Sequence, residues 1–214
     1  MKLDKKALLL YAVTDNSWLR GSTLYEQVEQ ALIGGVTMVQ LREKKMPEPE
    51  LFEEAKRMKE LCARYQVPLI INDYVELAKS AGADGVHIGQ GDMEVAQARR
   101  LLGDDKIIGV SARTAEQAVR AWEQGADYLG AGAAFATGTK QDAQVISYER
   151  IKSVCEAVPI PVAAIGGITI GNIARLSGSG ISGVAVVSGI FAQPDIQKAA
   201  ARLKEKVKTM LQVP

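Results

Sequence analysis

Basic side chains and an amide gather in one short stretch of the sequence, at Gln40, Arg42 and Lys44. Residues 38–41 alternate between apolar and polar types, which is typical of a β-strand. Every second residue of a strand points to the same side, so we expect these three side chains to share one face. A guanidinium with five donors beside a mobile ammonium suits phosphate or pyrophosphate. The alternative is a solvated strand edge with ordinary surface charges.

Two aspartates, Asp73 and Asp92, follow two further apolar runs that we expect to be neighbouring strands. Their carboxylates could then converge. Magnesium commonly takes one or two protein carboxylates, several waters and substrate phosphate oxygens. Opposite Arg42 and Lys44, the pair predicts a metal-bridged pyrophosphate. The competing interpretation is that Asp73 caps a helix and Asp92 belongs to a turn.

A second group of residues could bind a phosphate near the end of the chain. Gly166 and Gly167 follow the apolar run 162–165 and are expected to precede a helix, whose N-terminal amides attract anions. With Ser188, which follows the last predicted strand, they match the common phosphate site of α/β barrels. The long segment 133–146 contains Thr137, Thr139 and Lys140 and is predicted to be a lid or binding loop. A surface loop without a ligand is the alternative.

The only histidine, His87, lies within an apolar run and differs in parity from Gln90 and Asp92. We interpret it as a core histidine with satisfied hydrogen bonds. No Ser-His-Asp or Cys-His set can be assembled. The candidate residues therefore indicate electrostatic stabilisation of departing phosphate charge rather than acyl transfer.

The elements that must position these residues alternate between short β-branched runs and longer segments with helical periodicity. Eight strands are predicted, beginning near Leu8, Met38, Leu69, Gly85, Ile107, Tyr128, Val162 and Gly183. Each gap leaves room for the crossover that parallel strands require. The even-numbered strands are each entered through a glycine, at Gly35, Gly82, Gly125 and Gly180. The pattern predicts one α/β domain over residues 1–214, a (β/α)8 TIM barrel with its active site at the carboxyl ends of the strands.

Several helices show an apolar stripe at three- and four-residue steps. One stripe includes Leu51, Ala55, Met58 and Cys62. Two others comprise Ala115, Ala118, Val119 and Trp122, and Ile196, Ala199, Ala200, Leu203, Val207 and Leu211. Thr114 is predicted to cap the N-terminus of its helix.

Composition limits the classes of partner. The 214 residues carry a formal net charge of +1, with 47% hydrophobic and 24% charged residues, so neither nucleic acid nor a polybasic membrane contact is predicted. Cys62 and Cys155 show no disulfide or metal-ligand spacing. The N-terminus lacks the apolar segment of a signal peptide, and no run is long enough to span a bilayer. We expect a soluble, cytoplasmic protein. The oligomeric state stays open, and a homo-oligomer is allowed.

The order of these motifs resembles the thiamine-phosphate synthase family over nearly the whole chain. The similar segments are Tyr11-Ala12-Val13-Thr14-Asp15, the Gln-Leu-Arg-Glu-Lys run at 40–44, Ile70-Ile71-Asn72-Asp73, residues 84–92, Gly109-Val110-Ser111, residues 137–140, residues 164–168 and Val186-Val187-Ser188. The family is a (β/α)8 barrel that joins 4-amino-2-methyl-5-hydroxymethylpyrimidine diphosphate to a thiazole phosphate. The products are thiamine phosphate and pyrophosphate.

The resemblance implies a role for each matching residue. Residues implied to bind the pyrimidine diphosphate are Gln40, Arg42, Lys44, Asn72, Ser111 and Lys140; Ser111 would lie near the reacting carbon. Mg²⁺ would be held by Asp73 and Asp92. Residues implied to hold the thiazole phosphate are Thr137, Thr139, Gly167, Val187 and Ser188. Of these, Arg42, Lys44, Ser111 and Lys140 would be catalytic. The family route is dissociative. Pyrophosphate departs first, which generates a pyrimidine carbocation, and the thiazole nitrogen then captures this carbocation.

The sequence departs from the family pattern in the expected lid. Ala136 stands where the family usually has a proline, and a glycine that is frequent in the family is missing from residues 145–147. Losing a proline is expected to loosen the loop. Two alternatives remain, a paralogue resembling thiazole tautomerase and a non-catalytic sensor of thiamine precursors. A tautomerase would need a histidine base after the fifth strand, where Ser111-Ala112-Arg113 stands instead. A different phosphate-handling barrel is a further alternative, because fold does not fix function.

Overall fold

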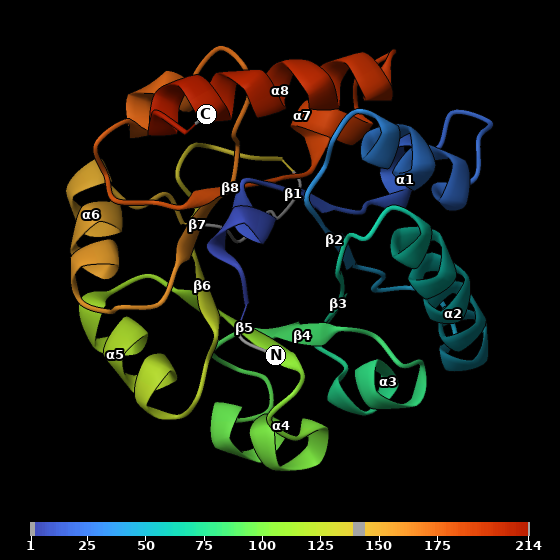
Figure 1. The fold of residues 1–214 in the computed structure, drawn as a ribbon, viewed down its shortest axis with the longest axis horizontal. Helices are drawn as coiled ribbons and strands as arrows, with labels where there is room; N and C mark the ends of the chain where they lie inside the picture. The colour runs from blue at the N-terminus through green and yellow to red at the C-terminus, as the bar shows by residue number, and fades with distance from the viewer. Residues whose placement is uncertain (1–2, 139–143, 214) are drawn as a thin grey trace.

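The computed structural model of the chain describes residues 3–138 and 144–213. Eight parallel strands close into a barrel in sequence order, so that β1 pairs with both β2 and β8. Figure 1 shows the strands at the centre of the molecule with the helices around them. The strands are β1 (Leu10–Val13), β2 (Met38–Leu41), β3 (Leu69–Asn72), β4 (Gly85–Ile88), β5 (Ile107–Ala112), β6 (Tyr128–Gly132), β7 (Val162–Ile165) and β8 (Gly183–Val186). The predicted single-domain (β/α)8 barrel is confirmed.

Seven of the eight strands begin at the predicted residue. The first begins at Leu10 rather than near Leu8. Lys5–Leu8 form the 3₁₀ helix η1, whose N-cap Asp4 accepts a hydrogen bond from the amide of Lys6. The side chain of Leu8 packs with residues inside the barrel, so the apolar run at 8–10 divides between η1 and β1.

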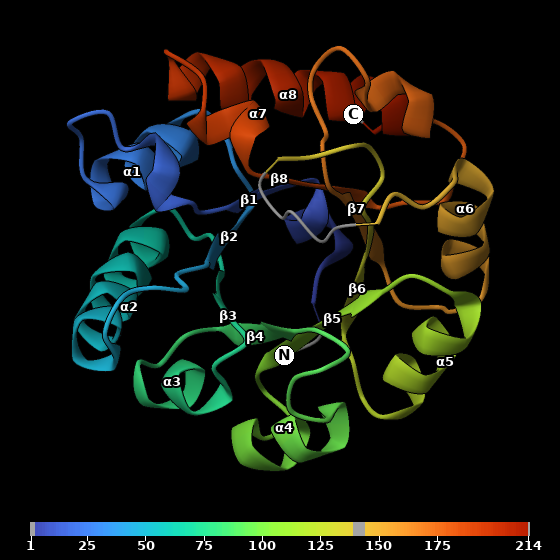
Figure 2. The same cartoon turned by 180° about the vertical axis from the view of Figure 1, so that it is seen from behind.

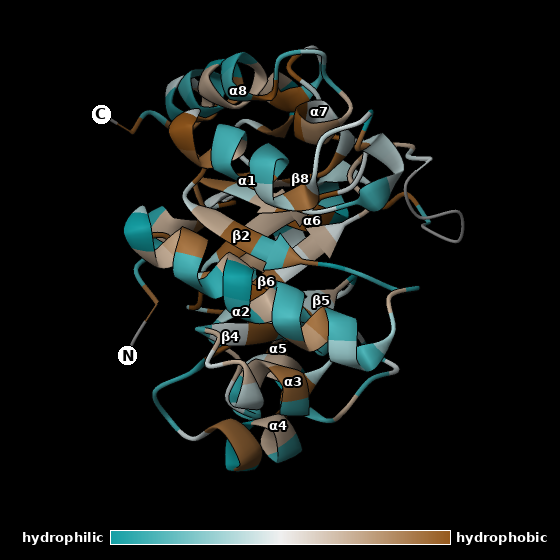
Figure 3. Ribbon diagram, turned by 90° about the vertical axis from the view of Figure 1, so that its right-hand side faces the viewer, coloured by the Kyte–Doolittle hydropathy of each residue, from teal (hydrophilic) through white to brown (hydrophobic). Residues whose placement is uncertain are grey.

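The helices form the outer layer of the barrel. They are α1 (Leu24–Ile33), α2 (Glu48–Arg64), α3 (Val75–Ser80), α4 (Val95–Leu102), α5 (Ala115–Glu123), α6 (Tyr148–Glu156), α7 (Ser188–Phe191) and α8 (Ile196–Leu211), with a further 3₁₀ turn η2 (Asn16–Trp18). In Figure 3, α2 alternates between hydrophilic and hydrophobic turns, as expected for a helix with one buried face. No helix in the described residues is long and apolar enough to cross a membrane.

The predicted helical stripes of α2 and α8 are confirmed at Leu51, Met58, Leu203 and Val207, all of which are buried. The stripe proposed for α5 is wrong in part. Trp122 is 41% exposed, whereas the buried residues of α5 are Ala118 and Ala121. Small alanines therefore form the buried face of α5, and the indole lies towards its exposed side. Thr114 caps α5 as predicted, because its side chain accepts a hydrogen bond from the amide of Gln117.

The glycine turns into the even-numbered strands have the predicted left-handed conformation, with φ between +68° and +100° at Gly35, Gly82, Gly125 and Gly180. In three of them, the polar residue two positions later accepts a hydrogen bond from the amide of a residue in the preceding strand. Thr37 bonds Leu10, Asp84 bonds Leu69 and Asp127 bonds Ile108. These bonds fasten successive strands at the amino-terminal end of the barrel.

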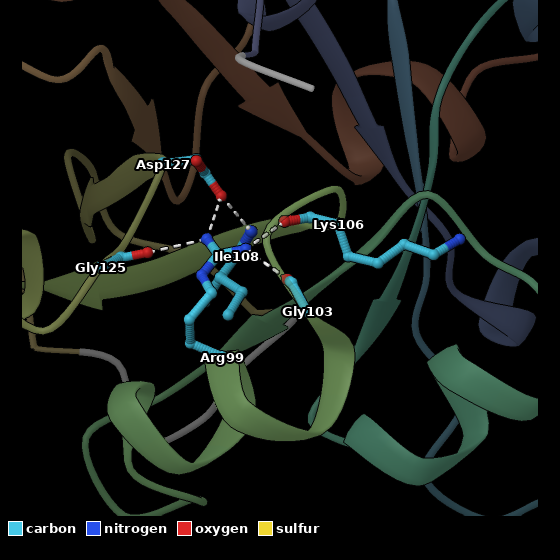
Figure 4. Close-up of polar contacts among 6 residues, drawn as sticks. All are labelled: Arg99, Gly103, Lys106, Ile108, Gly125 and Asp127. Atoms are coloured by element: carbon cyan, nitrogen blue, oxygen red, sulfur yellow. Dashed lines mark hydrogen bonds and ion pairs between the residues drawn. The ribbon is translucent and has the colours of Figure 1, made fainter.

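Figure 4 shows how Arg99 of α4 reinforces one of these turns. Its guanidinium donates to the carbonyls of Gly103, Lys106 and Gly125, and to Asp127 Oδ2 at 2.6 Å. One planar fork therefore satisfies three carbonyls and a carboxylate. This end of the barrel is structural, in agreement with its lack of candidate site residues.

The inside of the barrel is filled by its own apolar cluster, which includes Tyr11, Met38, Ile70 and Tyr128. Gly109 of β5 makes room for one of the aromatic rings, because a Cβ atom there would lie 2.0 Å from Cζ of Tyr128. The phenols of Tyr11 and Tyr128 meet at 2.9 Å. The interior is thus apolar with a polar centre.

The connection between β7 and β8 differs from the others. We expected a helix after Gly167, but the described chain has only the 3₁₀ turn η3 (Ile173–Leu176). Residues 166–180 contain five glycines, which oppose a regular helix. From the side shown in Figure 2, the loop after β6 runs beside β7. The amides of Ala134 and Phe135 donate to the carbonyls of Ile165 and Gly166.

Candidate active site

A pocket opens at the carboxyl ends of the strands, where the barrel interior meets the loops. The predicted site residues among its lining are Gln40, Arg42, Asn72, Ser111, Thr137, Gly167, Val187 and Ser188. They come from the ends of β2, β3, β5 and β8 and from the loops after β6 and β7. Residues more than 140 positions apart in the sequence therefore surround one cavity. Thr139 and Lys140 lie outside the described residues.

The end of β2 supplies the polar side of the pocket. Gln40 is 3% exposed and Arg42 is half-buried, and both line the cavity. The amide of Arg42 donates to Thr14 Oγ1 at 2.9 Å, which fixes the backbone where the strand ends. Lys44 lies beyond the end of β2 and is exposed, and it does not line this cavity. Burial raises the pKa of Asp73 and the ammonium of Lys44 opposes that rise, so Lys44 lies on the same side of the barrel as the carboxylates.

Asp73 and Asp92 converge, as expected from neighbouring strands. Burial raises the pKa of Asp73, and the charge of Asp92 and a hydrogen bond with it raise that pKa further. Asn72 donates to Asp73 Oδ2 at 2.6 Å, and Asp92 Oδ2 accepts from the amide of Gly89 at 2.7 Å. Tyr74, not Asp73, occupies the N-cap position of α3, so the helix-cap interpretation of Asp73 is wrong. The turn interpretation of Asp92 is correct, because Asp92 accepts from the amide of Gly89, and Asp92 also faces the carboxylate of Asp73.

Two carboxylates in contact favour a shared proton or a cation between them. Their hard oxygen atoms are ligands that Mg²⁺ prefers. The described residues contain no cluster of three or more His, Cys, Asp or Glu side chains that could enclose a metal. The pair therefore fits an ion that keeps several waters and takes its remaining ligands from a substrate, which is typical of magnesium.

The opposite side of the pocket is formed by the segments that follow β7 and β8. Gly166 and Gly167 have φ values of +99° and +62°, and a Cβ on Gly167 would lie 2.3 Å from the carbonyl oxygen of Ala136. After β8, the short helix α7 begins at Ser188 beside the pocket. The amides of Ile190 and Phe191 in this helix donate to the carbonyl of Val187. A glycine pair after β7 and a short helix after β8 are the elements of the common barrel phosphate site.

Sequence reasoning missed four residues in or beneath the pocket, namely Arg113, His87, Tyr128 and Tyr11. Arg113 follows β5 and lines the pocket. His87 is buried with satisfied hydrogen bonds, as expected, but it lines the pocket as well. Its ring is bonded to Tyr128 Oη at 3.0 Å and to Ser111 Oγ at 2.9 Å. Below them, Gln40 Nε2 donates to Tyr11 Oη at 2.5 Å. His87 does face a different place from Gln90 and Asp92, which line a separate pocket, but the side that it faces is the main cavity.

Glu43 is an unusual neighbour of the site. It is 7% exposed, and its Oε2 accepts from Asn16 Nδ2 at 2.6 Å. Its Oε1 is buried and has no partner among the described residues. Burial raises the pKa of Glu43 to about 7, the charge of Asp15 adds to that rise, and Arg42 opposes it.

The fold and the pocket together define a TIM-barrel enzyme that acts on phosphorylated small molecules, with its site at the carboxyl ends of the strands. The sequence matches the profile of the thiamine monophosphate synthase family over residues 10–190. The chain belongs to this family, whose members are transferases.

Individual relatives agree with the family match. A thiamine-phosphate synthase of Ruminiclostridium cellulolyticum is 47% identical over 92% of this chain and 93% of its own length. That of Clostridium acetobutylicum is 46% identical over 95% of this chain and 93% of its own. The solved structure of a thiamine phosphate pyrophosphorylase from Pyrococcus furiosus has a TM-score of 0.89 at 37% identity, covering 97% of this chain and 98% of that one.

Proposed function

We propose that this chain condenses 4-amino-2-methyl-5-hydroxymethylpyrimidine diphosphate with a thiazole phosphate, giving thiamine phosphate and pyrophosphate. One observation carries the proposal. A single pocket has polar and cationic side chains from β2, β3 and β5 on one side and residues of the segments after β7 and β8 on the other. Asp73 follows the lining residue Asn72 and interacts with Asp92, which lines a separate pocket. Two phosphorylated substrates could therefore bind on opposite sides of the pocket with their reacting atoms facing one another.

The pyrimidine diphosphate would occupy the side formed by β2 to β5. Arg42 and Lys44 would bind the diphosphate, with Lys140 of the loop after β6 as a third cation. Gln40, Asn72 and Ser111 would orient the pyrimidine. Asp73 and Asp92 would hold Mg²⁺, which, when bound, neutralises charge on the departing pyrophosphate.

The thiazole phosphate would occupy the opposite side. Gly167, Val187 and Ser188 would bind its phosphate, joined by Thr137 and Thr139 from the loop after β6. The glycine at 167 allows the backbone to approach the anion closely. Residues 133–146 would act as a lid, because the loop carries ligands for both substrates.

The reaction exchanges one bond for another. The bond between the pyrimidine methylene carbon and the diphosphate oxygen breaks, and its electron pair leaves with pyrophosphate. The thiazole nitrogen then donates its lone pair to the resulting carbocation and forms the carbon–nitrogen bond. This chemistry needs oriented substrates and charge stabilisation rather than a strong base. The residues around the pocket fit that demand.

Two observations disfavour the alternatives. At the end of β5, where a tautomerase would need a histidine base, this chain has Ser111-Ala112-Arg113. Degraded metal ligands would mark a non-catalytic sensor, whereas Asp73 and Asp92 are both present and interact with one another. We further propose a cytoplasmic enzyme whose partners are these small molecules.

An endpoint assay tests the function directly. Purified protein is incubated with both substrates in magnesium or in chelator, and thiamine phosphate and pyrophosphate are measured. We expect the two products in equal amounts, and only with magnesium. Bound pyrimidine diphosphate with no product in magnesium would favour the sensor instead.

A further inference from the structure

A chain of hydrogen bonds crosses the floor of the pocket and joins two of its polar residues. It runs from Gln40 Nε2 to Tyr11 Oη (2.5 Å), to Tyr128 Oη (2.9 Å), to His87 Nδ1 (3.0 Å), and from His87 Nε2 to Ser111 Oγ (2.9 Å). The first four residues are each at most 7% exposed. Water therefore does not compete for the first three bonds, whereas the bond from His87 to the half-buried Ser111 lies at the pocket.

The direction of the chain follows from what each group can do. An amide nitrogen can only donate, so Tyr11 Oη accepts from Gln40. A phenol has one proton, so Tyr11 must give its own to Tyr128. Burial raises the pKa of both tyrosines above their usual range, which keeps each phenol protonated.

The same reasoning continues through the imidazole. Tyr128 accepts from Tyr11, so its proton is directed at Nδ1 of His87. Nδ1 must then be unprotonated, and the neutral ring carries its proton on Nε2. This Nε2–H donates to Ser111 Oγ, which leaves the hydroxyl proton of Ser111 available to the pocket.

We propose that His87 is a positioning residue, fixed by Tyr11 and Tyr128 as the Nε2–H tautomer, which turns the hydroxyl of Ser111 into a hydrogen-bond donor towards the substrate. The same series of hydrogen bonds gives Gln40 the opposite role to Ser111, that of a hydrogen-bond acceptor towards the substrate. Its Nε2 is used by Tyr11, so its carbonyl oxygen is the group that can face a ligand. The site thus presents an acceptor at one end and a donor at the other.

The packing around the chain supports a dedicated arrangement. A Cβ on Gly109 would lie 2.3 Å from the Tyr128 hydroxyl, and one on Gly130 would lie 3.1 Å from Cε1 of His87. Glycines on β5 and β6 therefore leave the space in which the two rings reach one another. The role of Ser111 towards the substrate rests on the proposed function, whereas the tautomer of His87 does not.

The chain has a single histidine, so uniform ¹⁵N-histidine labelling reports on this ring alone. In the wild-type protein near neutral pH, we expect Nδ1 to resonate as a bare, pyridine-type nitrogen and Nε2 as a protonated one. Tyr128→Phe removes the donor to Nδ1, and both resonances should shift towards the positions of mixed tautomers. Tyr148→Phe is the control. It loses a hydrogen bond to the carbonyl of Ser177, which involves none of these residues, and it should leave both histidine resonances unchanged.

Activity supplies the second readout. The amide nitrogen of glutamine can replace Nε2 and still donate to Ser111, whereas the shorter asparagine side chain cannot reach it. We expect His87→Asn to lower kcat/KM about tenfold, and His87→Gln to stay within about threefold of the wild type. An Nδ1–H tautomer or an imidazolium in the wild type would overturn the proposal, as would equal losses in the two variants. Failure of the endpoint assay alone would leave the tautomer result standing.

Discussion

The buried carboxyl of Glu43 makes the stability of this protein depend on pH in a way that can be calculated. Its pKa is raised from 4.5 to about 7, first by burial and then by Asp15. The folded state therefore binds the proton more tightly than the unfolded state. Its contribution is fully present below pH 4.5 and is lost as pH rises through 7.

The size of the effect follows from the two pKa values. The gap between 4.5 and about 7 corresponds to a ceiling of about 3 kcal/mol. Hydration of the ionised carboxylate reduces it, so we expect about 1–2 kcal/mol. Glu43→Gln keeps the shape of the side chain and an oxygen that can accept from Asn16, but it cannot ionise.

Urea unfolding at pH 5 and pH 8 measures the difference. We expect Glu43→Gln to match the wild type within about 0.5 kcal/mol at pH 5 and to exceed it by about 1–2 kcal/mol at pH 8. Glu53→Gln on the exposed side of α2 is the control and should show no such change, since its side chain is 65% exposed. A Glu43→Gln variant with the same stability difference at both pH values would refute the reasoning.

Three further substitutions test the site and the scaffold. Arg42→Ala should reduce turnover at least about 100-fold with an unchanged unfolding midpoint; near-normal activity would contradict its place in the diphosphate site. Gly167→Ala would bring a Cβ within 2.3 Å of the carbonyl oxygen of Ala136, so KM for the thiazole phosphate should rise about tenfold, and an unaltered KM would argue against that subsite. Arg99→Met should destabilise the fold by about 2 kcal/mol in urea unfolding, because it leaves Asp127 without its cation; a loss below about 0.5 kcal/mol would show that water replaces the guanidinium.

The sequence was sufficient to predict the barrel because its signals are local. Apolar runs and left-handed glycines such as Gly82 and Gly125 recur at each strand entry, and seven strand starts were predicted correctly. The side chains that follow the strands were predicted to face one opening, and Gln40, Arg42 and Ser111 do line one pocket. Both features depend on short stretches of chain and on the known geometry of parallel barrels.

The remaining features depend on which residues meet across the barrel. The contact of His87 with Tyr128 joins β4 to β6, and that of Tyr11 with Tyr128 joins β1 to β6. The residue pattern of a single strand does not predict contacts between side chains of different strands. Gly109 and Gly130 do provide the space that these aromatic rings occupy. Trp122 was misassigned for a related reason, since periodicity shows which face of a helix is apolar but not how much room the barrel leaves beneath it.

The central claim is that the polar side of the pocket is one magnesium-assisted diphosphate site. Calorimetric titration with pyrophosphate, in magnesium and in chelator, tests it most directly on the wild type and on Asp92→Ala. We expect magnesium to tighten binding by the wild type at least about tenfold and to have little effect on the variant. Equal affinity with and without magnesium in the wild type, or an undiminished magnesium effect in Asp92→Ala, would contradict the account.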